Sequence, residues 1–217
     1  SRHSHAKSSA GTTKINNMLT EALPAVACTV DRLNTDLYAL NVGNGTLRFV
    51  RKEDEESDPD DPSFVWVARL DRHEPEDFIS KLAPHDWRPK AAHRELDAFL
   101  EKVQPDPEMR AFLQRLAGYI ALGIIDEQIM VIFHGGGRNG KSTFVALLCH
   151  VLGDYAVTLD VDSFTGENRR SGAEATPDLA RLPGARLVAS EEPDEGVRLK
   201  EGLIKRVTGG TKIPMRR

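Results

Sequence analysis

The sequence lacks several features that would narrow its class at once. No apolar run approaches the roughly 20 residues that a membrane-spanning helix needs, and no secretory signal peptide is visible. It has only two cysteines, Cys28 and Cys149, which lie far apart and without the spacing of zinc ligands. A disulfide scaffold and a zinc module are therefore excluded, and a reducing, cytoplasmic setting is expected.

Internal repeats are also absent, and the net charge of -4 hides an uneven distribution. Residues 53–62 hold seven acids and no base, which predicts a solvated loop. The last twenty residues, 198–217, hold seven bases against one acid. This basic end is either a contact for phosphate backbones or an ordinary solvated face.

What the sequence does contain is a glycine-rich stretch between two patterned segments. Residues 129–133 are apolar and rich in β-branched side chains, which predicts a buried strand. Residues 135–142 match G-x-x-x-x-G-K-[ST], and the apolar positions that follow them recur at helical spacing. Strand, loop and helix in this order are the context that a phosphate-binding P-loop requires.

The residue types of this loop suit a nucleoside triphosphate. Glycine lets phosphate oxygens approach main-chain N–H groups, and the helix N-terminus adds further donors. Lys141 is expected to reach the β- and γ-phosphates, and the hydroxyl of Ser142 to ligate Mg²⁺. The predicted nucleotide-binding residues are Gly135, Gly136, Gly137, Arg138, Asn139, Gly140, Lys141, Ser142 and Thr143. ATP and Mg²⁺ are the expected ligands.

Hydrolysis would also need carboxylates near the metal ion and the attacking water. The apolar residues 185–190 predict a strand that ends in Glu191 and Glu192. Open α/β sheets bind ligands at the carboxyl ends of their strands, so these two acids are catalytic candidates together with Lys141. Glu191 is the better candidate for the metal ion and Glu192 for the base, although the assignment stays open, as does a plain acidic turn.

The rest of the chain predicts two domains, with a boundary near residue 125. The first part, 1–124, is α+β and mainly helical, and strand–helix alternation begins only at residue 129. The predicted helices are 12–23, stopped by Pro24, then 75–82, 92–103, 107–122 and 197–207; the predicted strands are 37–42, 46–50, 64–68 and 155–159. Gly43-Asn44-Gly45 is a turn signal between the first two strands. For the helix 107–122, Asp106 is the predicted N-cap, Pro107 the first helical residue and Gly123 the closing residue.

These residues together resemble the helicase part of the phage and plasmid primase–helicases, a branch of the superfamily 3 helicases within the AAA+ ATPases. The resemblance spans nearly the whole chain, because weak elements follow one another in the family's order. They are residues 41–47, 73–81, 112–119, 135–143, 152–156, 186–191 and 204–210.

The resemblance implies a phage- or plasmid-replication helicase, working in a bacterial host cell, in which ATP hydrolysis drives DNA unwinding by a homo-hexameric ring. Residues 1–124 would be the helicase-associated N-terminal domain, and 125–217 would begin the α/β ATPase domain. The resemblance also gives Lys205 and Lys212 as candidate DNA contacts. Thr211 departs from the pattern, since the family usually has an acid there.

The family's fourth strand, its sensor asparagine and its arginine finger have no counterpart before Arg217, and no primase domain is recognised. The resemblance therefore implies an incomplete AAA+-type sheet, part of a longer protein, with weak activity and stability on its own. Two alternatives stay open. One is a nucleotide-binding assembly module without turnover, and the other is a P-loop kinase acting on a small molecule.

Overall fold

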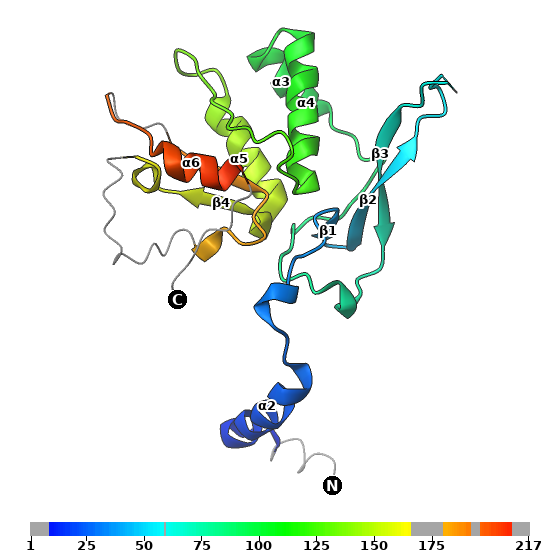
Figure 1. Cartoon of the computed structure of the whole chain (residues 1–217), viewed down its shortest axis with the longest axis vertical. Helices are drawn as coiled ribbons and strands as arrows, with labels where there is room; N and C mark the ends of the chain where they lie inside the picture. Colours follow the sequence, from blue (N-terminus) through cyan, green and yellow to red (C-terminus); the bar gives the residue numbers. More distant parts are fainter. Residues whose placement is uncertain (1–8, 59, 166–179, 192–195, 210–217) are drawn as a thin grey trace.

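The computed structural model describes residues 9–58, 60–165, 180–191 and 196–209. Its strands form two small sheets, and helices lie around them (Figure 1). The fold is thus mixed α/β, as the sequence predicts. Within the described residues, no helix is both long and apolar enough to cross a membrane.

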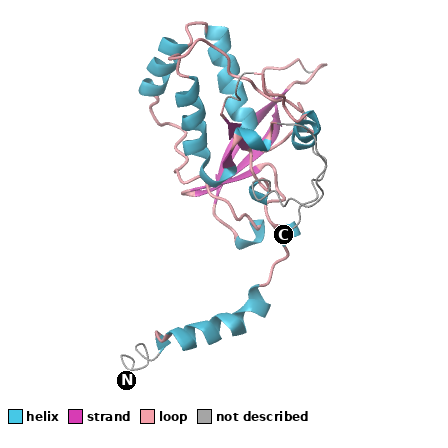
Figure 2. Cartoon of the chain, turned by 90° about the vertical axis from the view of Figure 1, so that its left-hand side faces the viewer, coloured by secondary structure: helices cyan, strands magenta, loops and turns pink. Residues whose placement is uncertain are grey.

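The N-terminal helix α2 (Thr12–Val26) stands apart from the rest of the molecule in two perpendicular views (Figures 1 and 2). It contains Pro24, so the prediction that this proline stops the helix is wrong. Proline removes one main-chain hydrogen bond to residue i−4, and its ring crowds the carbonyl group of that residue. Pro24 lies in the last turn, and the helix ends soon after it, at Val26. None of the residues of α2 is buried.

An antiparallel sheet follows, in the order β1–β2–β3. β1 (Ala39–Val42) and β2 (Gly45–Glu53) are joined by a two-residue turn at Gly43 and Asn44, as predicted. The described residues 54–58 and 60–63 lie in the loop to β3 (Phe64–Asp71), close to the predicted loop of 53–62, although Glu53 still belongs to β2. The predicted helix 75–82 is only a 3₁₀ turn, Pro75–Asp77, because Phe78 takes the left-handed conformation at φ 48° and ends it.

Two helices come next, α3 (Arg94–Val103) and α4 (Pro107–Leu122). α4 has the ends that its sequence predicts. The Asp106 carboxylate accepts a hydrogen bond from the main-chain N–H of Glu108, Pro107 occupies the first turn, and Gly123 closes the helix at φ 67°.

The last part contains α5 (Lys141–Leu152), β4 (Ala156–Leu159), β5 (Leu187–Ser190) and α6 (Glu201–Thr208). β4 and β5 form a two-stranded parallel sheet. α6 begins four residues later than predicted. Partial burial raises the pKa of the Cys149 thiol on α5, against a hydrogen bond with Thr158 that lowers it.

The predicted strand at residues 129–133 does not form. These residues have no strand partner among the described residues, and Ile129, Met130, Val131 and Ile132 are all exposed. A β-strand is held by hydrogen bonds to a neighbour, so an apolar, β-branched sequence is not sufficient without one. The structure therefore lacks this strand of the predicted AAA+-type sheet among the described residues, and the incomplete sheet as a whole stays a prediction.

The main hydrophobic core draws on both sides of the predicted boundary near residue 125. Leu40, Val42, Leu47 and Ala83 pack with Leu152 and Tyr155, and partly buried side chains from both halves cover this cluster. The glycine-rich loop and its helix are thus attached to the N-terminal sheet through a shared core.

Candidate functional site

The glycine-rich loop lies at the start of α5 and is largely open to solvent. Gly137 and Gly140 have φ values of 87° and 79°, and Arg138 between them has φ 52°. These three left-handed residues make the chain turn sharply, and glycine adopts this conformation at the least cost. A Cβ atom added at Gly136 or Gly137 would meet nothing within 4 Å, so the space beside this part of the loop is free.

The Lys141 side chain folds back over the loop. Its Nζ atom donates hydrogen bonds to the carbonyl oxygen of Gly135 at 3.0 Å and to Oδ1 of Asn139 at 2.9 Å. The loop therefore holds the ammonium group over its own main chain. Asn139, which the sequence placed only among the loop's binding residues, orients the lysine.

The first turn of α5 has the features that suit an anion. Gly140 precedes the helix without a side-chain cap, and the first turn carries no acid. The N–H groups there have no capping oxygen, and the helix dipole makes this end positive. A phosphate group with Mg²⁺ fits these residues, because main-chain donors, an ammonium group and the exposed hydroxyl of Ser142 converge at one helix end.

Packing holds the loop against the N-terminal half. A Cβ atom on Gly140 would lie 2.7 Å from Cγ1 of Val103 and 3.2 Å from Cζ of Phe99. The helix start therefore sits directly on α3, and Phe144 on its buried side lies 6.0 Å from Phe133, ring to ring. Gly140 is needed both for its φ and for this close approach.

Of the remaining predicted site residues, the structure describes two and leaves two outside the described ranges. Glu191 is exposed and comes directly after β5, at the end of the strand where the sequence puts it. Lys205 lies on α6 with an exposed side chain, and its Nζ atom is 3.5 Å from Oε2 of Glu201. Glu192 and Lys212 lie outside the described residues.

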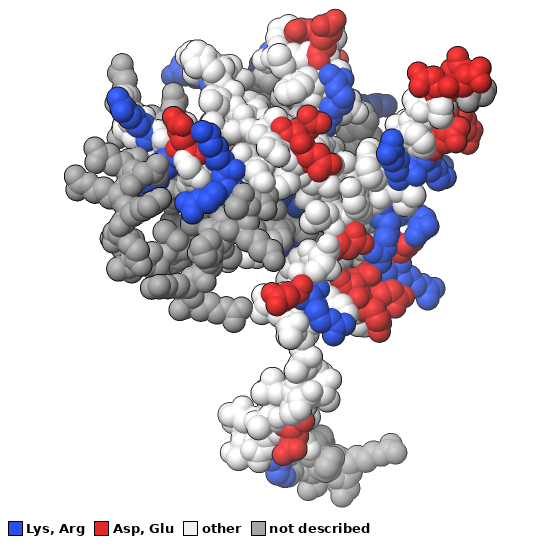
Figure 3. All heavy atoms as spheres, viewed as in Figure 1, with Lys and Arg blue, Asp and Glu red and all other residues white. Residues whose placement is uncertain are grey.

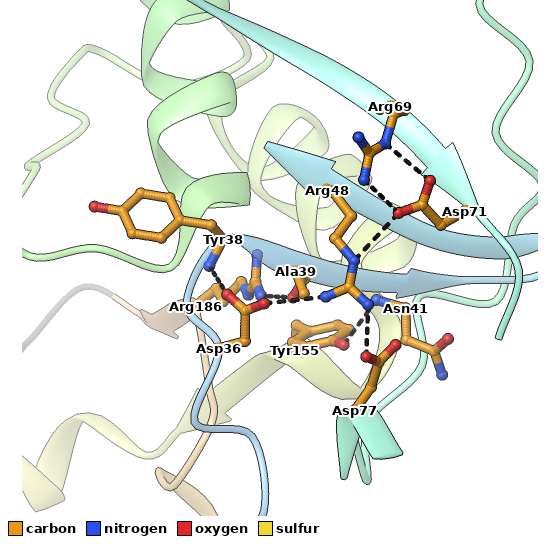
Figure 4. Close-up of polar contacts among 10 residues, drawn as sticks. All are labelled: Asp36, Tyr38, Ala39, Asn41, Arg48, Arg69, Asp71, Asp77, Tyr155 and Arg186. Carbon is orange, nitrogen blue, oxygen red and sulfur yellow. Dashed lines mark hydrogen bonds and ion pairs between the residues drawn. The ribbon is translucent and has the colours of Figure 1, made fainter. Parts of the chain in front are cut away.

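The structure also shows a polar junction that the sequence analysis missed (Figure 4). Arg186, just before β5, donates hydrogen bonds to the carbonyl oxygens of Ala121 and Ala39 and lies over the ring of Tyr155. Burial lowers the pKa of the Arg186 guanidinium. It thus joins the end of α4, the start of β1 and the strand that leads to Glu191. In the sequence, the only hint of this role was a charged residue, Arg186, directly before the apolar strand 187–190.

Comparison with known proteins agrees with a helicase-related chain. Residues 1–105, just under half of the chain, match the family model described as "D5 N terminal like". The chain is 34% identical over 123 residues to "Putative helicase L207/L206" of Acanthamoeba polyphaga mimivirus. The aligned segment covers 57% of this chain and 13% of that protein. It is 32% identical over 127 residues to "Putative helicase 022R" of Frog virus 3, covering 58% and 13%.

A third relative, "Putative helicase 184R" of Invertebrate iridescent virus 6, is 30% identical over 146 residues, or 63% of this chain and 14% of that protein. The chain spans about an eighth of the length of the first two relatives. These matches support a relationship to D5-like viral helicases. They leave the ATP site, the superfamily and the phage or plasmid setting as predictions.

Proposed function

We propose that residues 135–143 bind the phosphates of ATP with Mg²⁺. We also propose that the longer protein is a superfamily 3, AAA+-type DNA helicase of replication, assembled as a homo-hexamer. The observation that carries the first proposal is the position of Lys141: its ammonium group is held over the glycine-rich loop, at the uncapped end of α5. The helicase proposal is supported by the similarity to proteins named putative helicases.

Each predicted residue then has a defined task. Lys141 and the main-chain N–H groups of the loop hold the phosphates, and Asn139 keeps the lysine in place until they bind. Ser142 and Glu191 would hold Mg²⁺, and Glu192 would accept a proton from water. Bound ATP supplies the phosphoryl group whose transfer to water releases free energy. Lys205 and Lys212 would contact the DNA backbone.

Nucleotide binding can be tested directly on this chain with a fluorescent ATP analogue and Mg²⁺. Lys141→Met should weaken binding at least tenfold, because the ammonium group is lost while the helix is retained. Lys102→Met, on the exposed side of α3, is the matched control and should bind as the parent chain does. Equal binding by both variants would contradict the proposal that this loop binds the phosphates of ATP.

The helicase activity needs a separate test, on the longer protein that contains this chain. We expect ATP hydrolysis stimulated by single-stranded DNA and abolished by Glu192→Gln. Nucleotide binding without any turnover would favour the assembly module instead. Phosphoryl transfer to a metabolite, with no response to DNA, would favour the small-molecule kinase.

A further inference from the structure

β3 is the exposed edge of the antiparallel sheet. The order β1–β2–β3 gives this strand one partner, β2, and leaves its other side without a strand among the described residues. Within its eight residues there is neither proline nor lysine, and five large apolar side chains are exposed: Phe64 48%, Val65 41%, Trp66 44%, Val67 36% and Leu70 37%. A long apolar edge of this kind is a ready template for another strand, and proteins normally cover it or place charges on it.

The hydrogen-bond pattern shows which main-chain groups face outward. The N–H of Asp54 bonds to the carbonyl oxygen of Ser63 directly opposite, at 2.9 Å, so the register makes Lys52–Val65 and Val50–Val67 hydrogen-bonded pairs. The intervening residues of β3 then direct their N–H and C=O groups away from β2. The other edge of β2 agrees, because the N–H of Phe49, opposite Ala68, bonds to the carbonyl oxygen of Tyr38, directly before β1.

The distribution of charge along β3 indicates which kind of strand could pair with this edge. The acids of the loop, including Asp60 and Asp61, precede the strand, whereas Arg72 lies just past its other end. Arg69, on the strand itself, is paired with Asp71. Figure 3 shows the acidic group at the tip of the hairpin and basic side chains further along it. In an antiparallel pair of two identical strands, the acidic end of each lies beside the basic end of the other. The edge is therefore complementary to itself.

We propose that β3 pairs antiparallel with β3 of a second copy of this chain, across a two-fold axis at Val67, so that two three-stranded sheets become one. This register sets Trp66 opposite Ala68 of the second copy, a large side chain beside a small one on the same face. It also sets Phe64 opposite Leu70 of the second copy. The outward main-chain groups of Trp66 and Ala68 form the central hydrogen bonds. This contact goes beyond the proposed ATP site and does not depend on it. Because a two-fold contact cannot lie within a cyclic ring, it would join a subunit of one proposed hexamer to a subunit of another.

Sedimentation velocity of the full 217-residue chain over a range of concentrations tests the proposal, and a reversible dimer is expected. Ala68→Pro removes an outward N–H group but no bond to β2, so it should keep the circular dichroism spectrum and raise the dimer dissociation constant at least tenfold. Arg72→Glu should also weaken the dimer, and adding Asp61→Arg should restore it. Lys102→Glu, on α3, is the charge control and should change nothing.

Hydrogen exchange gives a readout that survives if Ala68→Pro does not fold. The amides of Val65 and Val67 should be protected at every concentration, whereas those of Trp66 and Ala68 should become protected only as the dimer forms. A monomer at all concentrations would overturn the proposal. So would a dimer with Trp66 and Ala68 unprotected, or protection of these two amides in a monomer that has bound a different polypeptide.

Discussion

The guanidinium carbon of Arg186 lies 4.8 Å from the centroid of the Tyr155 ring, and the two side chains together join parts of the chain more than a hundred residues apart. Tyr155 is almost fully buried at 2% exposure. Its hydroxyl oxygen accepts the main-chain N–H of Asn41 at 3.0 Å and donates to the carbonyl oxygen of Lys81 at 3.3 Å. The junction connects the N-terminal sheet to the strand that leads to Glu191.

Arg186→Lys should destabilise the fold. Two nitrogens of the planar Arg186 guanidinium donate to the carbonyl oxygens of Ala39 and Ala121. A lysine has a single ammonium group, which cannot reproduce both hydrogen bonds in this geometry. Leaving one buried acceptor without a donor costs about 1–3 kcal/mol, and urea unfolding should show a loss of that size. Arg181→Lys, at an exposed arginine that bonds to Thr158, is the control. Equal midpoints for the two variants would contradict the assigned role.

Tyr155→Phe should cost about 1–3 kcal/mol in the free energy of unfolding, because the N–H of Asn41 and the carbonyl of Lys81 lose their partner while the ring remains. Tyr119→Phe is the matched control. Its hydroxyl also accepts a main-chain N–H, that of Glu127 at 3.1 Å, but this bond is exposed. The control should therefore remain within about 0.5 kcal/mol of the parent chain.

The same tyrosine predicts a loss of stability in alkali. Burial raises the pKa of Tyr155, against a hydrogen bond from Asn41 that lowers it, so the folded state favours the neutral phenol. An unfolded tyrosine ionises near pH 10, so the stabilisation is complete below about pH 10 and declines as the pH rises through the folded pKa. Unfolding measured between about pH 8 and 11 should show this decline, and Tyr155→Phe should reduce it.

Arg48 predicts a second stability effect, in the cluster of Figure 4. Its guanidinium contacts Asp77 at 2.5 Å and Asp36 at 3.1 Å, and these carboxylates, with the Asp77 hydrogen bond first, raise the pKa of Arg48. Oδ2 of Asp77 is buried without a hydrogen-bond partner among the described residues. Arg48→Met would leave the half-buried carboxylate of Asp77 uncompensated, at a cost of about 1–3 kcal/mol. Arg69→Met, at an exposed pair, should have little effect on thermal unfolding.

Two glycines should respond oppositely to alanine. Gly118 lies inside α4, and a Cβ atom added there would meet nothing within 4 Å, so Gly118→Ala should stabilise the chain by about 0.5–1 kcal/mol. Gly140 has φ 79° and contacts Val103, so Gly140→Ala should destabilise the chain and weaken binding of the ATP analogue. Thermal unfolding and the binding titration together measure both. A gain in stability from Gly140→Ala would show that the loop packs differently.

Short-range signals made the local elements predictable. The Gly43–Asn44 turn, the Asp106 and Pro107 start of α4 and the helix after Lys141 all formed where the sequence indicated. Each depends on a few neighbouring residues whose conformational preferences agree. The strand at 129–133 failed for the opposite reason, since its apolar pattern needed a distant partner to provide hydrogen bonds.

The sequence by itself determined which functional groups the candidate site contains. These are the glycines, the lysine and the serine of residues 135–142, at the start of a helix, and the two acids after β5. Only the tertiary structure decided what supports them. It placed α3 against Gly140, set Asn139 under the Lys141 ammonium group, and used Arg186 and Tyr155 to join both halves. Helix ends and turns are local, whereas packing and the partners of buried polar groups depend on residues that the fold brings together.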